Sequence, residues 1–368
     1  MPTRLYLDHA ATTPLHPTAA QAVTRGLATW ANPSSPHAEG RQARAALESA
    51  RNVIKGAYGW AGELILTSGA SEAIGMALTR AQAASRIIAA TEHDAVLRVA
   101  PDAIRLPVGS DGRVDPHVLR ELLADAPAPA LVAIQWGNSE TGVIQPLRAI
   151  ADVVTEAEGV LFVDAAQMPA NWRGEDQPQD VADLIAISGH KRAGPAGIGG
   201  LLVRNLALLL PTGGQERGYR GGTENVPAAL GYAAAVAIPE DLAAMAGMRA
   251  RLDAAIAALG GEVVAGTAPR SPHIASYRLP GLSAAAQLIR FDMAGIAVSA
   301  GSACSSGTMR PSHVLGAMGW EGAAAGEVIR VSFGRDTTPA DIERFITAWA
   351  NIAREVRARA ATTTETPA

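Results

Sequence analysis

Two side chains of opposite charge stand where apolar runs of the chain end. Lys191 follows the run Asp183–Ser188, and Asp164 closes the run Val160–Asp164. Ligands of open α/β sheets bind outside the carboxyl ends of the strands, so we expect both groups at one binding edge. A lysine whose pKa is lowered by burial or nearby cations can form a Schiff base with a carbonyl compound. A solvated lysine and a helix-capping aspartate are the ordinary alternatives, and neither stretch alone excludes them.

A carboxylate at the depth of Asp164 needs a cationic partner, and a protonated pyridine nitrogen would be one. Enzymes that use pyridoxal phosphate (PLP) need such an acid to keep the coenzyme ring an electron sink. Thr67–Glu72, T-S-G-A-S-E, follows another apolar run, so the N–H groups of Ala70 and Ser71 could bind a phosphate at a helix N-terminus. A plain helix cap is the alternative there. His93 follows a further run, where a single histidine is more often structural but could stack on a coenzyme or move protons.

Cys304 is the only cysteine of the chain and lies in S-A-G-S-A-C-S-S-G, Ser299–Gly307. Its small and polar neighbours indicate an accessible loop and not a buried position. Because a free thiol has a pKa of about 8.5, a modest shift would make it a thiolate nucleophile near neutral pH. A tolerated surface cysteine is the alternative. A single thiol excludes an internal disulfide and any multi-cysteine metal site.

Alternating strand and helix patterns must position these side chains. Apolar runs predict strands covered on both faces, and the stretches between them predict helices, which together favour an α/β fold with a mostly parallel sheet flanked by helices. The expected strands are Glu63–Thr67, Arg86–Thr91, Leu131–Gln135, Val160–Asp164, Asp183–Ser188 and Ile198–Val203, and the expected helices are Ala38–Tyr58, Ser71–Ala84, Pro116–Ala124 and Pro146–Glu158.

The pattern changes after an Ala-rich helical region that runs from Val226 to about Leu259. Shorter strands and helices follow, and the chain closes with a helix expected from Pro339 to about Ala360. Its start carries a capping box, with Thr338 as N-cap and Asp341 three residues later. We therefore expect a large α/β domain at 15–250 and a smaller α+β domain formed by 1–14 and 251–368, which carries the cysteine.

The composition restricts the class of protein. Hydrophobic residues make up 48% of the 368 residues and charged residues 18%, as in a globular protein with a sizeable core. The net charge of -4 and the scattered basic residues give no electrostatic footprint for nucleic acid. No stretch is long and apolar enough to span a bilayer, and the N-terminus shows no signal peptide, so we expect a cytoplasmic protein that binds no membrane.

Taken in order, these stretches resemble the cysteine desulfurases of the class V aminotransferase group, which are fold-type I PLP enzymes. The resemblance begins at Y-L-D-H-A-A-T-T-P and N-P-S-S-P-H and continues through the four strand-end stretches to E-R-G-Y-R-G-G-T-E, Glu216–Glu224. It closes with the cysteine stretch, which is similar to the NifS/IscS type, and with I-R-V-S-F-G-R, Ile329–Arg335. Together the motifs span nearly the whole chain, although each alone is weak.

The resemblance implies a role for each matching residue. Lys191 would hold PLP as a Schiff base and move protons at the substrate Cα, His93 would stack on the ring, and Cys304 would attack the substrate sulfur. Asp164 would pair with the pyridine nitrogen and Gln167 would bind the phenolic oxygen. Further coenzyme contacts are implied for Ala70, Ser71, Ser139, Ser188, His190 and Thr223, the last from a neighbouring subunit, and substrate contacts for Arg330 and Asn32.

One position departs from the pattern of the family. Many relatives have a second Asn where this chain has Ser139, within N-S-E-T-G, Asn138–Gly142. That Asn normally contacts the phenolic oxygen of the coenzyme. With the shorter Ser139, the contact could be lost, bridged by water or made by Asn138.

The reaction implied by the resemblance converts L-cysteine to L-alanine and leaves the sulfur as a persulfide on Cys304. The sulfur would then pass to an acceptor protein, for example in iron–sulfur cluster assembly or in thiolation, and a homodimer is expected. A selenocysteine lyase, or another class V enzyme such as an aminotransferase or a kynureninase, is an alternative. A non-catalytic scaffold is a third reading, and the presence of Lys191, Asp164, His93, Cys304 and Arg330 together argues against it.

Overall fold

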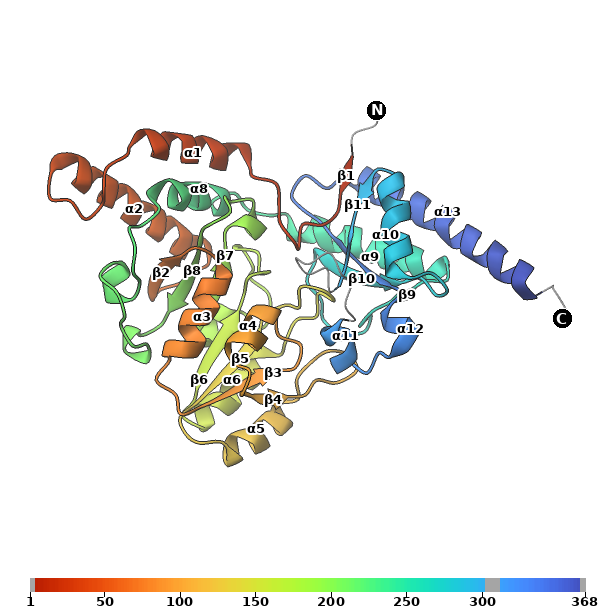
Figure 1. Cartoon of the computed structure of the whole chain (residues 1–368), viewed down its shortest axis with the longest axis horizontal. Coiled ribbons are helices and arrows are strands. Elements are labelled where there is room, and N and C mark those ends of the chain that lie inside the picture. Colours follow the sequence, from red (N-terminus) through yellow and green to blue (C-terminus); the bar gives the residue numbers. More distant parts are fainter. Residues whose placement is uncertain (1–3, 302–311, 365–368) are drawn as a thin grey trace.

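A seven-stranded sheet forms the centre of the larger half of the protein (Figure 1). The computed structural model describes residues 4–301 and 312–364, with side chains to residue 358, so Cys304 lies outside the described residues. Strand β8 runs antiparallel to both of its neighbours, and every other pair of neighbouring strands is parallel. The order across the sheet is β2 (Glu63–Thr67), β8 (Gly199–Val203), β7 (Leu184–Ser188), β6 (Val160–Asp164), β5 (Ala130–Gln135), β3 (Ser85–Ala89) and β4 (Ile104–Leu106).

Helices cover both faces of this sheet, because successive residues of each strand point to opposite sides. One face packs on α3 (Ala70–Arg80) and α4 (Asp94–Val99). The other packs on α2 (Ala38–Ala57), α5 (Pro116–Asp125), α6 (Leu147–Glu156) and α8 (Val226–Val236), and α1 (Pro17–Ala28) lies against α8. In β6, Leu161 and Val163 face the second layer, whereas Val160 and Phe162 face the first. Strands buried on both faces explain the apolar runs of the sequence.

A second core joins the N-terminal segment to the C-terminal part of the chain. Leu5 and Leu7 pack with Phe345 and Trp349 of the C-terminal helix, and Met245 of α9 packs there too, so the predicted division at residue 250 falls inside α9. This half has a four-stranded antiparallel sheet, β12-β13-β10-β9, and a parallel pair, β1-β11. Its elements are β1 (Leu5–Tyr6), α9 (Leu242–Ala258), β9 (Glu262–Val263), β10 (Ile274–Arg278), α10 (Ala284–Met293), β11 (Ile296–Ala297), β12 (Ser299–Ala300), α11 (His313–Ala317), α12 (Gly322–Ala325), β13 (Val328–Ser332) and α13 (Pro339–Thr364).

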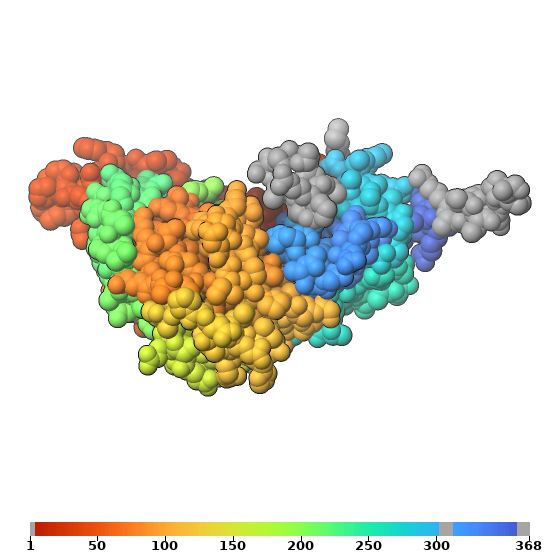
Figure 2. All heavy atoms as spheres, turned by 60° about the horizontal axis from the view of Figure 1, so that its bottom comes forward, coloured from red at the N-terminus to blue at the C-terminus, as the bar shows by residue number. Residues whose placement is uncertain are grey.

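The two halves of the protein contact each other directly, through residues near 100–110 in one half and α11 and α12 in the other. In the space-filling view, the orange surface of residues near 100–110 touches the blue surface of α11 and α12 (Figure 2). Val108 packs against Val314 and Met318, and His313 Nε2 lies 2.9 Å from the carbonyl oxygen of Glu92. In the part of the chain that the structure describes, no helix is long and apolar enough to cross a membrane.

The sequence predicted the main elements, with errors at their ends. The predicted α/β fold with a mostly parallel sheet is confirmed, and the capping box is present: Thr338 N–H donates to Asp341 Oδ2 at 2.9 Å and Asp341 N–H to Thr338 Oγ1 at 3.3 Å. The helix predicted at 71–84 ends at Arg80, and the strand predicted at 86–91 ends at Ala89. Strand β4 and helices α1 and α4 were not predicted, because each is short or lacks a clear apolar period.

Candidate active site

Lys191 lies directly beyond the carboxyl end of β7, in the short 3₁₀-helix His190–Arg192. The side chain is half-buried, and burial lowers the pKa of its amine to about 8. The negative charge of Asp164 opposes this shift, whereas the positive charges of Arg330 and Arg192 add to it. The backbone is held by Thr13, whose Oγ1 donates to the Lys191 carbonyl oxygen at 3.2 Å. At neutral pH a larger fraction of this amine is uncharged and nucleophilic than in an ordinary lysine.

Asp164 and His93 complete the charged centre of the site. Asp164 ends β6, is 7% exposed, and accepts one hydrogen bond from Ala166 N–H at 3.0 Å. His93 is exposed and caps α4 through Nδ1, which accepts from Ala95 N–H at 3.1 Å. Its pKa is lowered by the surrounding protein and by the positive charge of Lys191, while Asp164 raises it. A neutral His93 ring with Nδ1 as acceptor carries its proton on Nε2.

A turn and two strand ends bring together polar groups suited to an anion. Helix α3 begins at Ala70 without a side-chain cap, so the N–H groups of its first turn, Ala70 and Ser71 included, point outward at the edge of the sheet. Ser188 Oγ is buried and has no protein partner among the described residues. Gly199 permits the turn to lie this close, because a Cβ there would come within 2.7 Å of Gly69. Oriented N–H groups and a free hydroxyl at this edge match the needs of a phosphate.

The N-terminal segment contacts two of the predicted coenzyme-binding residues, His190 and Gln167. His190 Nδ1 lies 3.1 Å from Thr12 Oγ1, and its pKa is lowered by burial and by the charges of Lys191 and Arg192. Gln167 is buried, donates Nε2 to the Ala10 carbonyl oxygen at 2.9 Å, and has no protein partner at Oε1. Residues 10–13 therefore cover the same edge of the large sheet from the other half of the protein.

The N-S-E-T-G turn restricts which residue can contact a coenzyme. Asn138 donates Nδ2 to Thr91 O and Gln135 Oε1, at 3.2 and 3.1 Å. Its Oδ1 accepts from Glu140 N–H and Thr141 N–H, both at 2.9 Å. The Asn138 amide thus has no free N–H, so it is not available to replace the missing Asn at position 139. Ser139 itself is half-buried and offers its carbonyl oxygen to Arg330.

Arg330 reaches the site from the second half of the protein. It is buried in the middle of β13, donates Nη2 to Asp8 Oδ1 at 2.7 Å and Nη1 to Ser139 O at 2.9 Å. Its Nε has no protein partner among the described residues. A guanidinium held on two sides by protein groups has a fixed orientation, which suits recognition of a carboxylate.

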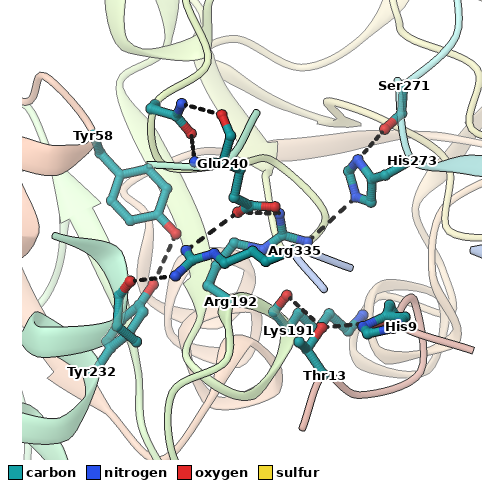
Figure 3. A network of polar contacts seen from close by, with 12 residues as sticks. His9, Thr13, Tyr58, Lys191, Arg192, Tyr232, Glu240, Ser271, His273 and Arg335 are labelled. Atoms are coloured by element: carbon teal, nitrogen blue, oxygen red, sulfur yellow. Dashed lines mark hydrogen bonds and ion pairs between the residues drawn. The ribbon is translucent and has the colours of Figure 1, made fainter. Parts of the chain in front are cut away.

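Arg192, the residue after Lys191, forms an ion pair with the segment that connects the two halves of the protein. Arg192 is buried and donates Nη1 to Glu240 Oε1 at 3.0 Å, and Glu240 lies between α8 and α9. Arg335 Nη2 approaches the same carboxylate at 3.7 Å, and Figure 3 shows both guanidinium groups beside it. Arg192 Nη2 also lies 3.4 Å from Nε2 of His273, whose pKa is lowered far below its usual value by burial. A buried and a half-buried guanidinium thus share one carboxylate here.

The remaining predicted residues lie elsewhere. Asn32 is exposed in the loop between α1 and α2, where its Oδ1 accepts from Ser34 N–H at 2.8 Å. This loop borders a hollow of about 240 Å³ that Gly214 and Glu224 also line, and exposed Thr223 directly precedes Glu224. Asn32 and Thr223 thus belong to the outer surface near the α1–α2 loop, and no described contact joins either of them to Lys191. Their predicted roles, like that of Cys304, stay predictions.

Several residues of the site escaped the sequence analysis. Asp8, Thr12 and Thr13 lie within the N-terminal motif, but nothing local indicates that they reach Arg330 or Lys191. Glu92 follows Thr91 and is fully buried, with Oε1 accepting from Gln135 N–H at 2.7 Å; burial and the charge of Asp164 raise its pKa well above the usual value. The signal for Glu92 was its place directly before His93 at a strand end. No cluster of groups suited to a metal ion occurs among the residues that the structure describes.

Comparison with known proteins gives this geometry a family. A model of the family described as aminotransferase class-V matches residues 5–345. The chain belongs to the aminotransferase class-V family. It is 36% identical to a cysteine desulfurase of Cereibacter sphaeroides, over 96% of this chain and 97% of that protein. It is 34% identical to an IscS-like cysteine desulfurase of Mycobacterium tuberculosis, over 92% of this chain and 93% of that one.

Solved structures agree with the sequence relatives. A NifS-like protein from Rickettsia africae superposes with a TM-score of 0.86 at 30% identity, and the match covers 95% of this chain and 99% of the other. The family and the NifS-like fold that the sequence predicted are therefore confirmed.

Proposed function

We propose that this chain is a PLP-dependent cysteine desulfurase that converts L-cysteine to L-alanine and takes the sulfur on Cys304. One observation carries the proposal: Lys191 and Asp164 lie at the carboxyl ends of the neighbouring strands β7 and β6, with Arg330 near enough for its charge to act on the Lys191 amine. A reactive amine near an acid for a pyridine nitrogen and a guanidinium for a carboxylate suits an enzyme of α-amino acids. The relatives named as cysteine desulfurases support the choice of substrate.

The residues at the sheet edge fit PLP. Ser188 Oγ and Gln167 Oε1 are buried polar atoms without a protein partner among the described residues, and Gly199 leaves room for the turn at the start of α3. Lys191 would hold the coenzyme aldehyde, Asp164 its ring nitrogen, and Ser188 with Ala70 and Ser71 its phosphate. Bound PLP supplies an electron sink that stabilises the carbanion formed when a substrate loses its Cα proton.

The side chains of this protein then divide the work. Arg330 binds and orients the substrate carboxylate. Lys191 Nζ takes the proton from the substrate Cα and returns it later, a task suited to an amine whose pKa of about 8 lies near the working pH. The Cys304 thiolate attacks the substrate sulfur, so an S–S bond forms as the Cβ–S bond breaks. A proton completes the methyl group of alanine, and Cys304 keeps the sulfur as a persulfide, which balances the reaction.

The setting of the enzyme is part of the same proposal. We infer a homodimer in which Thr223 contacts the coenzyme phosphate of the neighbouring subunit. Exposed Thr223 has no described contact with its own Lys191, which supports this arrangement. A sulfur-acceptor protein would take the persulfide sulfur.

The test is production of alanine and sulfide from L-cysteine by the purified protein, with dithiothreitol to release the sulfur. Lys191→Ala should lower the rate by at least ~10³-fold, because both the Schiff base and the proton transfer are lost. Cys304→Ser should retain bound coenzyme and the spectral change on adding L-cysteine, yet release no sulfide. Full desulfurase activity of Cys304→Ser, or turnover only with selenocysteine or only in the presence of a keto acid, would refute the proposal.

A further inference from the structure

Glu140 lies where the two ends of the cysteine-bearing segment come together. The segment 302–311 is outside the described residues, and Gly301 and Ser312 flank it. Ser312 Oγ donates to Glu140 Oε2 at 2.5 Å. A Cβ on Gly301 would come within 2.2 Å of the same Oε2 and 3.6 Å of Ser312 Cβ. One carboxylate oxygen therefore contacts Ser312 and packs directly on the backbone of Gly301.

The carboxylate is itself held firmly. Glu140 is buried, its N–H donates to Asn138 Oδ1 at 2.9 Å, and its carbonyl oxygen accepts from Ser276 Oγ at 2.7 Å. Asn138 is fixed in turn by Thr91 and Gln135 beside the large sheet. The contacts of Glu140 therefore reach both halves of the protein at once.

The same turn positions the substrate-binding guanidinium. Arg330 Nη1 donates to the carbonyl oxygen of Ser139, the residue before Glu140. Ser312 Oγ also caps α11 by accepting from Leu315 N–H at 3.1 Å. Within this turn, Ser139 thus contacts Arg330, and Glu140 contacts both ends of the cysteine-bearing segment.

We propose that Glu140 is a positioning residue for sulfur transfer: it fixes Gly301 and Ser312 relative to Arg330, so that Cys304 meets the sulfur of the bound substrate. The inference rests on the proposed desulfurase function. Binding of L-cysteine depends on Arg330 and the coenzyme, whereas the attack on sulfur depends also on where the segment starts and ends. Loss of the Glu140 carboxylate should therefore slow the attack on sulfur and leave the binding of L-cysteine unchanged.

The experiment compares Glu140→Ala with Glu140→Gln in the coenzyme-loaded protein. The Gln variant keeps an acceptor of the same shape for the Ser312 hydroxyl and serves as the conservative control. Single-turnover formation of alanine and of persulfide on Cys304, measured by mass spectrometry, should fall at least about tenfold in Glu140→Ala and less than about threefold in Glu140→Gln. The affinity for L-cysteine, measured by the spectral change in the Cys304→Ser background, should change less than about twofold in both.

A readout independent of activity completes the test. Hydrogen exchange at residues 299–301 and 312–316 should become faster in Glu140→Ala and stay near wild type in Glu140→Gln. Gly301→Ala, which pushes a methyl group against the carboxylate, should reproduce the slow persulfide formation if Glu140→Ala fails to fold. Unchanged persulfide formation in these variants, or an equal loss of L-cysteine affinity, would overturn the positioning role. A wild-type protein that forms no persulfide would instead refute the proposed function.

Discussion

The two walls of the site are built in different ways. The large-domain wall, Lys191, Asp164 and Ser188, consists of residues at the ends of neighbouring strands, so the hydrogen-bonded backbone of one sheet fixes their spacing. The small-domain wall, Arg330, Gly301 and Ser312, is held by side-chain contacts between residues far apart in the sequence. Asp8 binds Arg330 within the small half, and Glu140 binds Ser312 across the two halves. The groups proposed to bind the coenzyme therefore share one rigid element, whereas the groups proposed to position the substrate and its sulfur depend on individual polar contacts.

The largest expected effect concerns the large-domain wall. In Gly199→Ala, the new Cβ would lie 2.6 Å from Ile187 O in β7 and 2.7 Å from the backbone of Gly69 at the start of α3, so one of these backbone segments must shift. We expect a loss of about 3 kcal/mol in unfolding free energy together with loss of bound coenzyme. Urea unfolding and coenzyme absorbance measure the two effects. Gly75→Ala in α3, where no heavy atom lies within 4 Å, is the control and should be neutral or slightly stabilising. An equally small effect of Gly199→Ala would mean that the backbone at this edge of the sheet can shift to accommodate a Cβ, and would contradict the prediction.

Arg330→Lys tests the small-domain wall. Lysine keeps the charge but loses the planar fork of N–H groups that bonds Asp8 and Ser139. We expect KM for L-cysteine to rise by about 10- to 100-fold, with coenzyme content unchanged. Steady-state kinetics and the coenzyme spectrum measure these quantities. A fall in coenzyme content instead would mean that coenzyme binding depends on the small-domain wall as well, and would contradict the division of roles between the two walls.

Acid should lower the free energy of unfolding through His9, which lies in the N-terminal segment. Burial lowers the pKa of His9 to about 4, with Arg192 adding to the shift and Asp336 and Glu240 opposing it. Between pH 6.5 and 4 the unfolded chain binds a proton that the folded chain does not, so stability is full above pH 6.5 and falls as the pH drops. His9 alone should cost about 2 kcal/mol between pH 7.5 and 5. Urea unfolding at both pH values should show that His9→Gln reduces this loss, and an unchanged loss would exclude His9 as its source.

The smallest expected effect is electrostatic. Arg192→Leu removes one of the positive charges that lower the pKa of Lys191 from its usual value to about 8. The pH at which the lysine becomes reactive should therefore rise, by less than about one unit because burial remains the main cause. The pH dependence of the rate at which the coenzyme-free protein takes up PLP measures it. Arg204→Leu, which removes an arginine that lies over the ring of Trp60, is the control. A midpoint that falls in Arg192→Leu would contradict the account.

The sequence by itself determined the large sheet and the wall that it carries. Apolar runs with a charged or small residue at the end specify a buried strand and the start of its loop within a few residues, so Asp164, Lys191 and Ser188 could be placed at one edge. Only the tertiary structure decided the other wall. Asp8 and Arg330 are 322 residues apart, and Glu140 and Ser312 are 172 apart. Such pairs leave no local pattern, because contact between distant residues depends on how the chain packs, within the small half for Asp8 and Arg330 and across the two halves for Glu140 and Ser312. The periodicity of either segment carries no information about it.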